Sequence, residues 1–253
     1  DGVVTQTGKL PVLKAAPGKT ATLRIKIKST DLKPGQESHL RIYFVTKSDL
    51  PWASKGHEVA WDEFALPAKA SGRRTTLRSK RGQLTLSETA RTATVATDQF
   101  SIRFNTQSGA LTSLKYHNNE HLLAGPKLNV WRAPTDNDGI KLRPQGRKPL
   151  GKWQSIGLDH LRIKTNNIQI QNRKDGAIIV NVRQSAIPSK VKYGFDFQQI
   201  YTILSTGDIH VQNTVKADKR LPDLPRIGVQ LVLQPGLEQF GWFGRGPHES
   251  YWD

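Results

Sequence analysis

The chain of 253 residues carries 38 Lys and Arg against 21 Asp and Glu, giving a formal net charge of +17, and it contains no Cys. The lack of Cys excludes disulfides, thiolate zinc sites and thiol nucleophiles. No run reaches the roughly 18 apolar residues of a membrane span, so neither a membrane partner nor a signal peptide is predicted. The charge favours non-specific adhesion to polyanions. Because the basic residues form no stripe on a helix, no specific nucleic-acid partner is predicted.

Apolar and polar residues alternate in many short runs, which is the period of half-buried β-strands. Such strands are predicted at residues 23–28, 100–104, 195–197 and 209–215. More continuous apolar runs, which predict strands covered on both faces, lie at residues 40–45, 177–182, 200–204 and 227–233. Gly, Pro, Asn and Asp separate these runs about every ten to twenty residues, a spacing that indicates antiparallel hairpins and sandwiches.

Helical patterns are nearly absent, and at most a short turn of helix is predicted after Asp159. Residues 141–152 are rich in Arg, Lys, Pro and Gly, so we interpret them as a long exposed loop. A stretch poor in large apolar residues at 65–90 predicts a domain boundary near residue 88. Residues 1–88 would then form a small β-sandwich with a basic linker, and residues 89–253 a larger β-domain.

Polar residues are densest in the segment WRAPTDNDG at residues 131–139. Asp136 and Asp138 could offer oxygen ligands to Ca²⁺, but the further acids of an EF-hand loop do not follow. The favoured interpretation is a turn in which Asp136, Asn137 and Asp138 bond neighbouring backbone amides. Arg132 is expected to pair with Asp136 or Asp138. A sugar contact involving Trp131 is the alternative.

A second cluster, residues 241–252, combines three glycines with aromatic residues that could stack on sugars or pack in a core. Its candidates for carbohydrate binding or a polar network are Arg245, His248 and Glu249. His248 and Glu249 are adjacent, so in a strand they would face opposite ways and could not act as an acid/base pair. A third cluster, residues 56–64, is assigned structural use.

No catalytic or metal-binding residue is predicted. The chain shows no Gly-x-Ser-x-Gly elbow, phosphate loop or dinucleotide fingerprint. Its His residues lack metal-ligand spacing, and its carboxylates form no recognisable glycosidase pair.

Residues 131–138, 56–61 and 244–251 together resemble three landmarks of the large β-galactosidases of glycoside hydrolase family 2, in that family's order and at about its spacing. The stretch 100–114 also resembles the strand–turn–strand that opens the family's last domain. The resemblance implies an all-β chain. An immunoglobulin-like β-sandwich would be followed by a truncated β-supersandwich of the galactose-mutarotase type.

The resemblance also implies a function: the chain would be the non-catalytic C-terminal portion of a retaining β-galactosidase, serving as scaffold and subunit contact. The catalytic glutamates and metal ligands would lie on a barrel outside it. No cofactor is expected here, whereas the complete enzyme would bind Mg²⁺ and Na⁺. Expected partners are a galactoside, through the complete enzyme, and further copies in a homo-oligomer.

The start at Asp1 and the absence of Met indicate a piece of a longer protein. The family favours a cytoplasmic location, with a periplasmic or secreted one left open. Two other functions also stay open at this point: a carbohydrate-binding module of mutarotase-like fold and a polyanion-binding basic protein.

Overall fold

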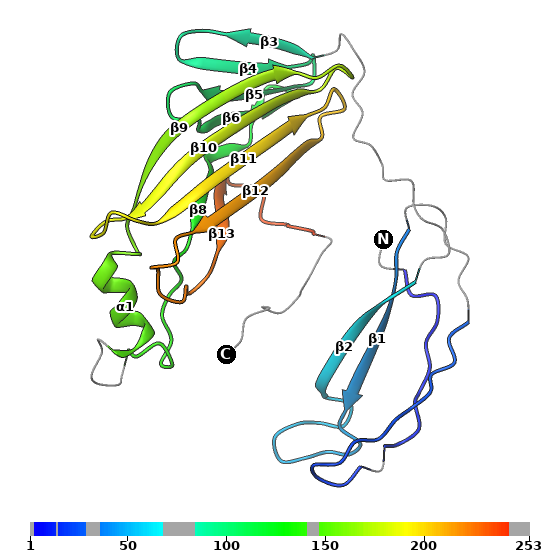
Figure 1. Ribbon diagram of the computed structural model, residues 1–253. Coiled ribbons are helices and arrows are strands. Elements are labelled where there is room, and N and C mark those ends of the chain that lie inside the picture. Colours follow the sequence, from blue (N-terminus) through cyan, green and yellow to red (C-terminus); the bar gives the residue numbers. More distant parts are fainter. Residues whose placement is uncertain (1–2, 14, 29–35, 68–83, 141–146, 243–253) are drawn as a thin grey trace. The chain divides into compact units, whose positions relative to one another are not determined.

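The computed structural model describes residues 3–13, 15–28, 36–67, 84–140 and 147–242. The chain divides into two compact units, Asp1–Thr76 and Leu77–Asp253 (Figure 1). Thirteen strands and one helix lie in the described residues, so the predicted all-β class is confirmed. The eight-residue helix is too short to cross a membrane, and no other helix is found in this described part.

The first unit contains one hairpin. Strand β1 (Ser38–Val45) pairs antiparallel with β2 (Glu58–Leu66). Thr46 is the only buried residue among the described residues of this unit. The strand predicted at residues 23–28 is wrong, since the structure assigns it no ladder. Leu23 and Ile25 are half-buried there but Ile27 is exposed, so alternation predicted two of the three inward side chains and no backbone partner.

The second unit begins with a five-stranded antiparallel meander in the order β3-β4-β5-β6-β7. Its strands are β3 (Thr85–Glu88), β4 (Thr92–Ala96), β5 (Phe100–Asn105), β6 (Leu111–Tyr116) and β7 (Asn119–Glu120). Strand β3 ends at Glu88, on the N-terminal side of the predicted boundary, yet it pairs with β4. It therefore belongs to the sheet of the second unit.

Two further sheets complete this unit. The four-stranded sheet has the order β12-β11-β10-β9, and β13 pairs with β8 in a two-stranded sheet. These strands are β8 (Leu122–Asn129), β9 (Leu161–Asn172), β10 (Ile178–Pro188), β11 (Phe195–Ile203), β12 (Ile209–Ala217) and β13 (Gly228–Leu233). Figure 1 shows the four-stranded sheet as a long layer that spans the other two sheets. Sequential antiparallel neighbours agree with the turns predicted between the apolar runs.

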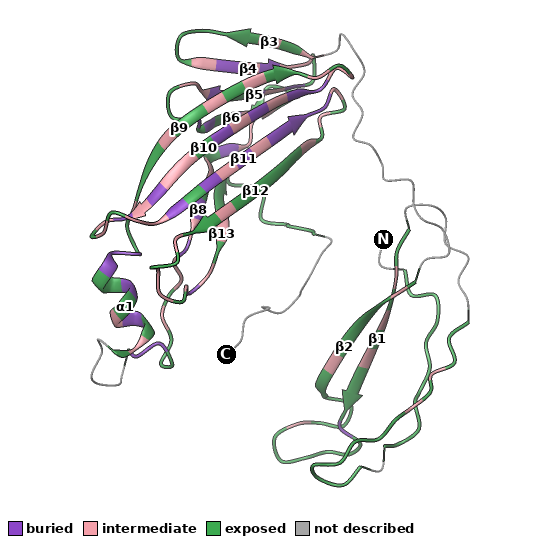
Figure 2. Ribbon diagram, in the orientation of Figure 1, coloured by how far each residue is buried: buried purple, intermediate pink, exposed green. Residues whose placement is uncertain are grey.

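The core of this unit lies on the inward face of the four-stranded sheet, whose buried residues are on β10 and β11 (Figure 2). One cluster joins these strands to the five-stranded sheet through residues such as Phe104, Val180 and Tyr201. A second cluster joins them to β8 and the helix through residues such as Leu128 and Phe197. The expectation of strands buried on both faces is wrong for β1, in which Tyr43, Phe44 and Val45 are 49%, 47% and 54% exposed. It is also wrong for β13. That strand is an edge strand, and Leu231, Val232 and Leu233 are 46%, 40% and 39% exposed.

The helix α1 (Pro149–Ile156) contradicts the loop predicted at residues 141–152. Residues 141–146 lie outside the described part, but the helix begins at Pro149, a position that suits Pro because no N–H bond is lost there. Leu150, Trp153 and Ile156 are buried at a spacing of three. The turn of helix predicted after Asp159 is also wrong. The helix precedes that residue and ends at Gly157, whose φ of 70° is left-handed.

Candidate functional site

The polar loop, residues 131–139, connects β8 to α1, with the chain entering from the last residue of β8. The Asn129 Oδ1 atom accepts a hydrogen bond of 2.9 Å from the Trp131 N–H, and its Nδ2 group donates to Gln230 Oε1 at 3.4 Å. A side chain that bonds the backbone two residues ahead turns the chain out of the strand. The loop therefore starts in a fixed direction.

An ion pair closes the loop. Arg132 donates from Nη1 to Asp138 Oδ2 at 2.7 Å and from Nη2 to Asp138 Oδ1 at 3.2 Å, a fork-to-carboxylate geometry. Thr135 donates to the same carboxylate from its backbone N–H at 2.7 Å and from its hydroxyl at 3.2 Å. Asp138 is only 5% exposed. Of the two carboxylates that the sequence offered to Arg132, the structure thus joins Asp138 to it.

The charge state of Asp138 follows from these contacts. Burial raises the pKa of Asp138, but the hydrogen bond from the Thr135 N–H, the hydrogen bond from Arg132 and the Arg132 charge together outweigh it. The net pKa of Asp138 lies below its usual value. The carboxylate is therefore ionised at neutral pH and is suited to holding a cationic side chain. It is not poised to transfer protons near neutrality.

The remaining contacts of Arg132 tie the loop to the β12–β13 connection, residues 218–227. Its Nε group donates to the Pro225 carbonyl at 3.1 Å, and Nη1 also donates to the Ala133 carbonyl at 3.2 Å. Together with the two bonds to Asp138, at least four of the five guanidinium N–H donors point at partners within the protein. Few donors remain for a bound ligand.

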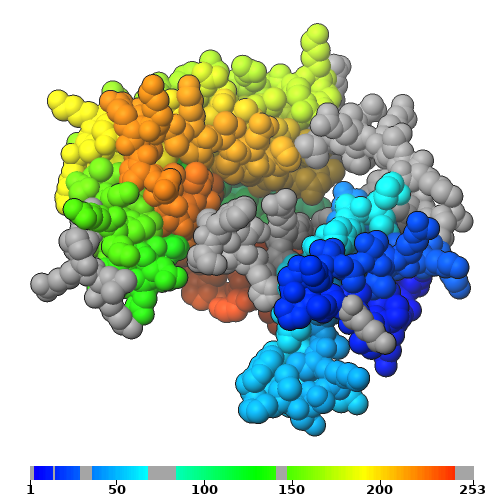
Figure 3. Space-filling view, turned by 60° about the horizontal axis from the view of Figure 1, so that its bottom comes forward, coloured from blue at the N-terminus to red at the C-terminus, as the bar shows by residue number. Residues whose placement is uncertain are grey.

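Helix α1 is attached to both segments. The Leu150 N–H donates to the Asp138 carbonyl at 3.0 Å, and Trp153 Nε1 donates to the Asp223 carbonyl at 2.7 Å. Figure 3 shows the helix and its preceding loop, in green, beside the orange chain that follows β12. Gly139 allows the close approach of loop and helix, because an added Cβ would come within 2.5 Å of Lys148 Cβ. The φ of +109° at Gly139 also favours Gly.

The aromatic side chain of the loop packs against the helix. Trp131 is half-buried, and its ring meets the Trp153 ring edge-on at 6.1 Å between centroids. The Arg132 guanidinium carbon lies 5.8 Å from the centroid of the same Trp153 ring. Such edge-on aromatic contacts are typical of a packed protein core.

The remaining predicted residues are not part of the contacts described above. Asp136 and Asn137 are exposed at the tip of the loop, where backbone bonds from Asp138 to Thr135 and from Gly139 to Asp136 form the turn. Among the residues with described positions, no group of three or more His, Asp or Glu could hold a metal ion. Arg245, His248 and Glu249 lie outside the described residues, so their relation to the polar loop stays a prediction.

The cluster at residues 56–64 belongs to the first unit, where its contacts are local. The backbone N–H of His57 donates to the Thr46 hydroxyl at 3.0 Å. The centroid of the His57 ring lies 5.9 Å from that of the Trp52 ring. Trp61 stacks with Arg41 at 4.4 Å. The Thr46 and Trp52 contacts lie at the β1–β2 turn and the Arg41 contact lies on the paired strands, so the described contacts of the cluster are of the structural kind predicted.

Sequence reasoning predicted that Asp138 would bond a neighbouring backbone amide, as it does at Thr135. It missed three parts of the network: the Thr135 hydroxyl, Trp153 and the Pro225 carbonyl. A signal for Trp153 existed, because Leu150, Trp153 and Ile156 recur at helical spacing behind Pro149. No local signal could identify the Pro225 carbonyl, which lies 93 residues from Arg132.

Comparisons with known proteins cover both units. A family model described as the β-galactosidase small chain matches residues 96–253. A second model, described as β-galactosidase domain 4, matches residues 1–67.

Curated proteins that are similar to this chain are named β-galactosidases. A β-galactosidase of Priestia megaterium is 30% identical over 206 residues, which cover 81% of this chain and 19% of that protein. A β-galactosidase of Vibrio cholerae is 28% identical over 261 residues, covering all of this chain and 24% of that protein. A β-galactosidase of Kluyveromyces lactis is 28% identical over 214 residues, covering 83% and 20%. The chain thus spans about a fifth to a quarter of the length of these relatives.

Proposed function

The chain belongs to the β-galactosidase small-chain family, and from this premise we propose that it is a non-catalytic supporting part of a retaining β-galactosidase. The complete enzyme hydrolyses terminal non-reducing β-D-galactosides by way of a glycosyl-enzyme intermediate. The two carboxylic acids of that reaction, and the Mg²⁺ and Na⁺ sites, belong to a catalytic barrel. This chain contributes a scaffold beside that barrel and surfaces for subunit contact in a homo-oligomer.

The commitment of Arg132 to internal partners is the observation that carries the scaffold proposal. A sugar-binding Arg presents its donors to ligand hydroxyls, whereas Arg132 directs donors at Asp138 and at the carbonyls of Pro225 and Ala133. Trp131 likewise offers its ring to Trp153. The polar loop therefore serves best as a brace that fixes α1 and the β12–β13 connection at one end of the second unit.

Titration calorimetry with galactose tests the brace against a sugar site. We expect no heat of binding up to about 10 mM galactose for the chain or for a Trp131→Phe variant. The control variant is Arg183→Lys, on the exposed face of β10. Saturable heat that is lost in Arg132→Lys and kept in Arg183→Lys would overturn the scaffold role of the loop. That result would favour the carbohydrate-binding alternative.

A further inference from the structure

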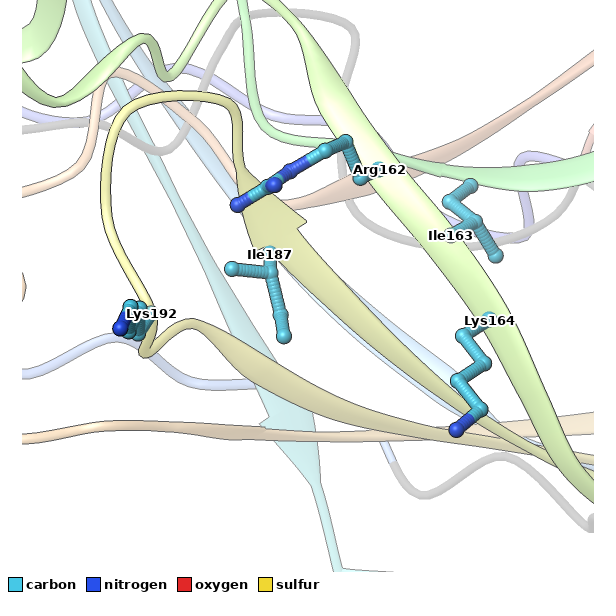
Figure 4. Close-up of a pocket in the computed structure, with 5 residues that line it drawn as sticks. All are labelled: Arg162, Ile163, Lys164, Ile187 and Lys192. Atoms are coloured by element: carbon cyan, nitrogen blue, oxygen red, sulfur yellow. The ribbon is translucent and has the colours of Figure 1, made fainter.

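A basic hollow of about 270 Å³ lies where β9 begins and β10 ends, well away from the polar loop in sequence. Its lining consists of Arg162, Ile163, Lys164, Ile187 and Lys192. Figure 4 shows Arg162 reaching across the end of β10, Ile187 lying beneath it, and Lys192 on the turn that follows. Three cations thus surround an apolar floor, and no carboxylate is part of the lining.

The strand register places two of these cations on one face. Arg162 is directly opposite Ile187, and Lys164 is directly opposite Ser185. Residues two apart on a strand share a face, so Arg162 and Lys164 both project to the outer side of the four-stranded sheet. Lys192 approaches from the β10–β11 turn. The strand register and the turn therefore set where these side chains leave the backbone, while the lysine ammonium groups can reorient.

The Arg162 guanidinium is held in place by backbone carbonyls. Its Nη2 group donates to Val191 O at 2.8 Å and to Pro188 O at 3.5 Å. These two bonds fix the planar fork at the rim of the hollow, so its other donors need no further ordering to meet a ligand. Pro188 is fully buried, which makes the anchor point rigid.

The positive charge of the hollow has no partner within the described part of the chain. No ion pair there joins Arg162, Lys164 or Lys192 to a carboxylate. Asp196, on the neighbouring strand, is in register with Ser185 on one side and Lys216 on the other, so it faces a cation of its own. Like charges that converge without a counter-charge are unfavourable unless an anion binds between them.

We propose that this hollow binds a tetrahedral oxyanion, a sulfate or phosphate group, with Arg162 as the fixed fork and Lys164 and Lys192 as the two mobile cations. Guanidinium matches two oxygens of such a group, and ammonium groups neutralise its remaining charge. The floor formed by Ile187 has room for a few carbons that carry the group. The inference does not rest on the proposed function, since the hollow shares no residue with the polar loop.

The test is a titration of the ¹⁵N-labelled chain followed by backbone amide shifts, in low salt at pH 7. The probes are sodium sulfate, sodium phosphate, galactose 6-sulfate and, as neutral control, galactose. We expect saturable shifts for the amides of Lys164, Ile187 and Lys192 with each anion and none with galactose. Addition of 0.5 M NaCl shortens the screening length to a few ångströms and is expected to abolish them. Tighter binding of galactose 6-sulfate than of sulfate would show that the group is recognised on a sugar, and equal binding that the oxyanion alone suffices.

Two double variants of equal charge separate a site from general attraction. Lys164→Gln with Lys192→Gln removes two cations of the hollow and is expected to raise the dissociation constant roughly tenfold, the effect of about 1.4 kcal/mol. Lys127→Gln with Lys152→Gln removes two exposed lysines elsewhere and is expected to leave it unchanged. Equal weakening in both variants, or shifts that do not saturate by about 50 mM anion, would overturn the proposal.

Discussion

The two units use the same alternation of apolar residues with opposite results. In the second unit, the inward residues of β10 and β11, such as Val180, Phe197 and Tyr201, are 0–2% exposed. In the first unit, Phe44, Val45 and Phe64 on β1 and β2 remain 47%, 54% and 47% exposed. The difference is a second layer, because the four-stranded sheet faces other sheets of its unit, while the β1–β2 hairpin is the only sheet among the described residues of the first unit. Alternation predicts a strand, but burial needs a facing surface.

The largest expected effect on stability tests this difference between the two units directly. Phe104→Ala removes a side chain that is fully buried and meets the Tyr201 ring at 5.0 Å between centroids. We expect a loss of about 3–5 kcal/mol in the unfolding free energy of the second unit, from lost transfer energy and a cavity. The matched change Phe64→Ala in the first unit should cost less than about 1 kcal/mol. Urea unfolding combined with hydrogen exchange of each unit measures both. Similar costs would show that the units are equally packed.

The next effect concerns the ion pair of the polar loop. Asp138→Asn leaves the half-buried Arg132 guanidinium without a counter-charge, and we expect a loss of about 2–3 kcal/mol. The comparison variant is Asp136→Asn at the tip of the same loop, expected to cost less than Asp138→Asn because Asp136 is exposed to solvent. Urea midpoints of the two variants decide the matter. If Asp136→Asn were the more damaging change, the assignment of Asp138 as the partner of Arg132 would be contradicted.

A smaller effect tests the link between α1 and the β12–β13 connection. Trp153→Phe keeps a buried aromatic ring but removes the Nε1–H that donates to the Asp223 carbonyl at 2.7 Å. Loss of that bond should cost about 1–2 kcal/mol and speed hydrogen exchange in residues 218–227. The exposed Trp52 provides the control, since Trp52→Phe should leave exchange unchanged in both units. Unaltered exchange in Trp153→Phe would argue against this link.

The smallest expected effect is a loss of folding stability as the pH falls. Arg173 donates to Asp175 from Nε at 2.7 Å, and this hydrogen bond is the main cause that lowers the pKa of Asp175 from 3.8 to about 2. Because the folded pKa lies below the unfolded one, the unfolded state binds more protons as the pH falls. The stabilising contribution is therefore complete above about pH 4 and is lost between about pH 4 and pH 2.

Screening by solvent keeps this contribution small, since both side chains are about a third exposed. Arg173→Gln should flatten the dependence of the melting temperature on pH between pH 4 and pH 2, whereas Arg183→Gln, an exposed Arg on β10, should not. An unchanged slope in Arg173→Gln would show that the pair contributes nothing measurable.

The sequence predicted those features that depend on near neighbours. Strands β5, β10, β11 and β12 follow from alternation or apolar runs, and the Arg132 pairing with a nearby Asp follows from their closeness in one short turn. Other features depend on distant partners. The carbonyls of Pro225 and Asp223 that bind Arg132 and Trp153 lie 93 and 70 residues away, and no local period encodes them.

The errors have physical causes as well. Helix α1 escaped prediction because Lys, Gly and Gln separate its three buried residues, so the segment is about as polar as a loop. Strand β13 was expected to be buried because its residues are apolar, whereas an edge position in a two-stranded sheet leaves them partly exposed. The composition of a segment shows how apolar it is, whereas its burial depends on which other elements the topology places against it.

The central claim is that this chain supports a β-galactosidase without carrying its catalytic groups. Incubation of the purified chain with nitrophenyl β-D-galactoside, at high protein concentration and neutral pH, tests it most directly. We predict release of nitrophenol at the buffer rate, with or without Mg²⁺ and Na⁺. The claim would be contradicted by turnover above the buffer rate that is lost in the Glu249→Gln variant and kept in the Glu58→Gln variant.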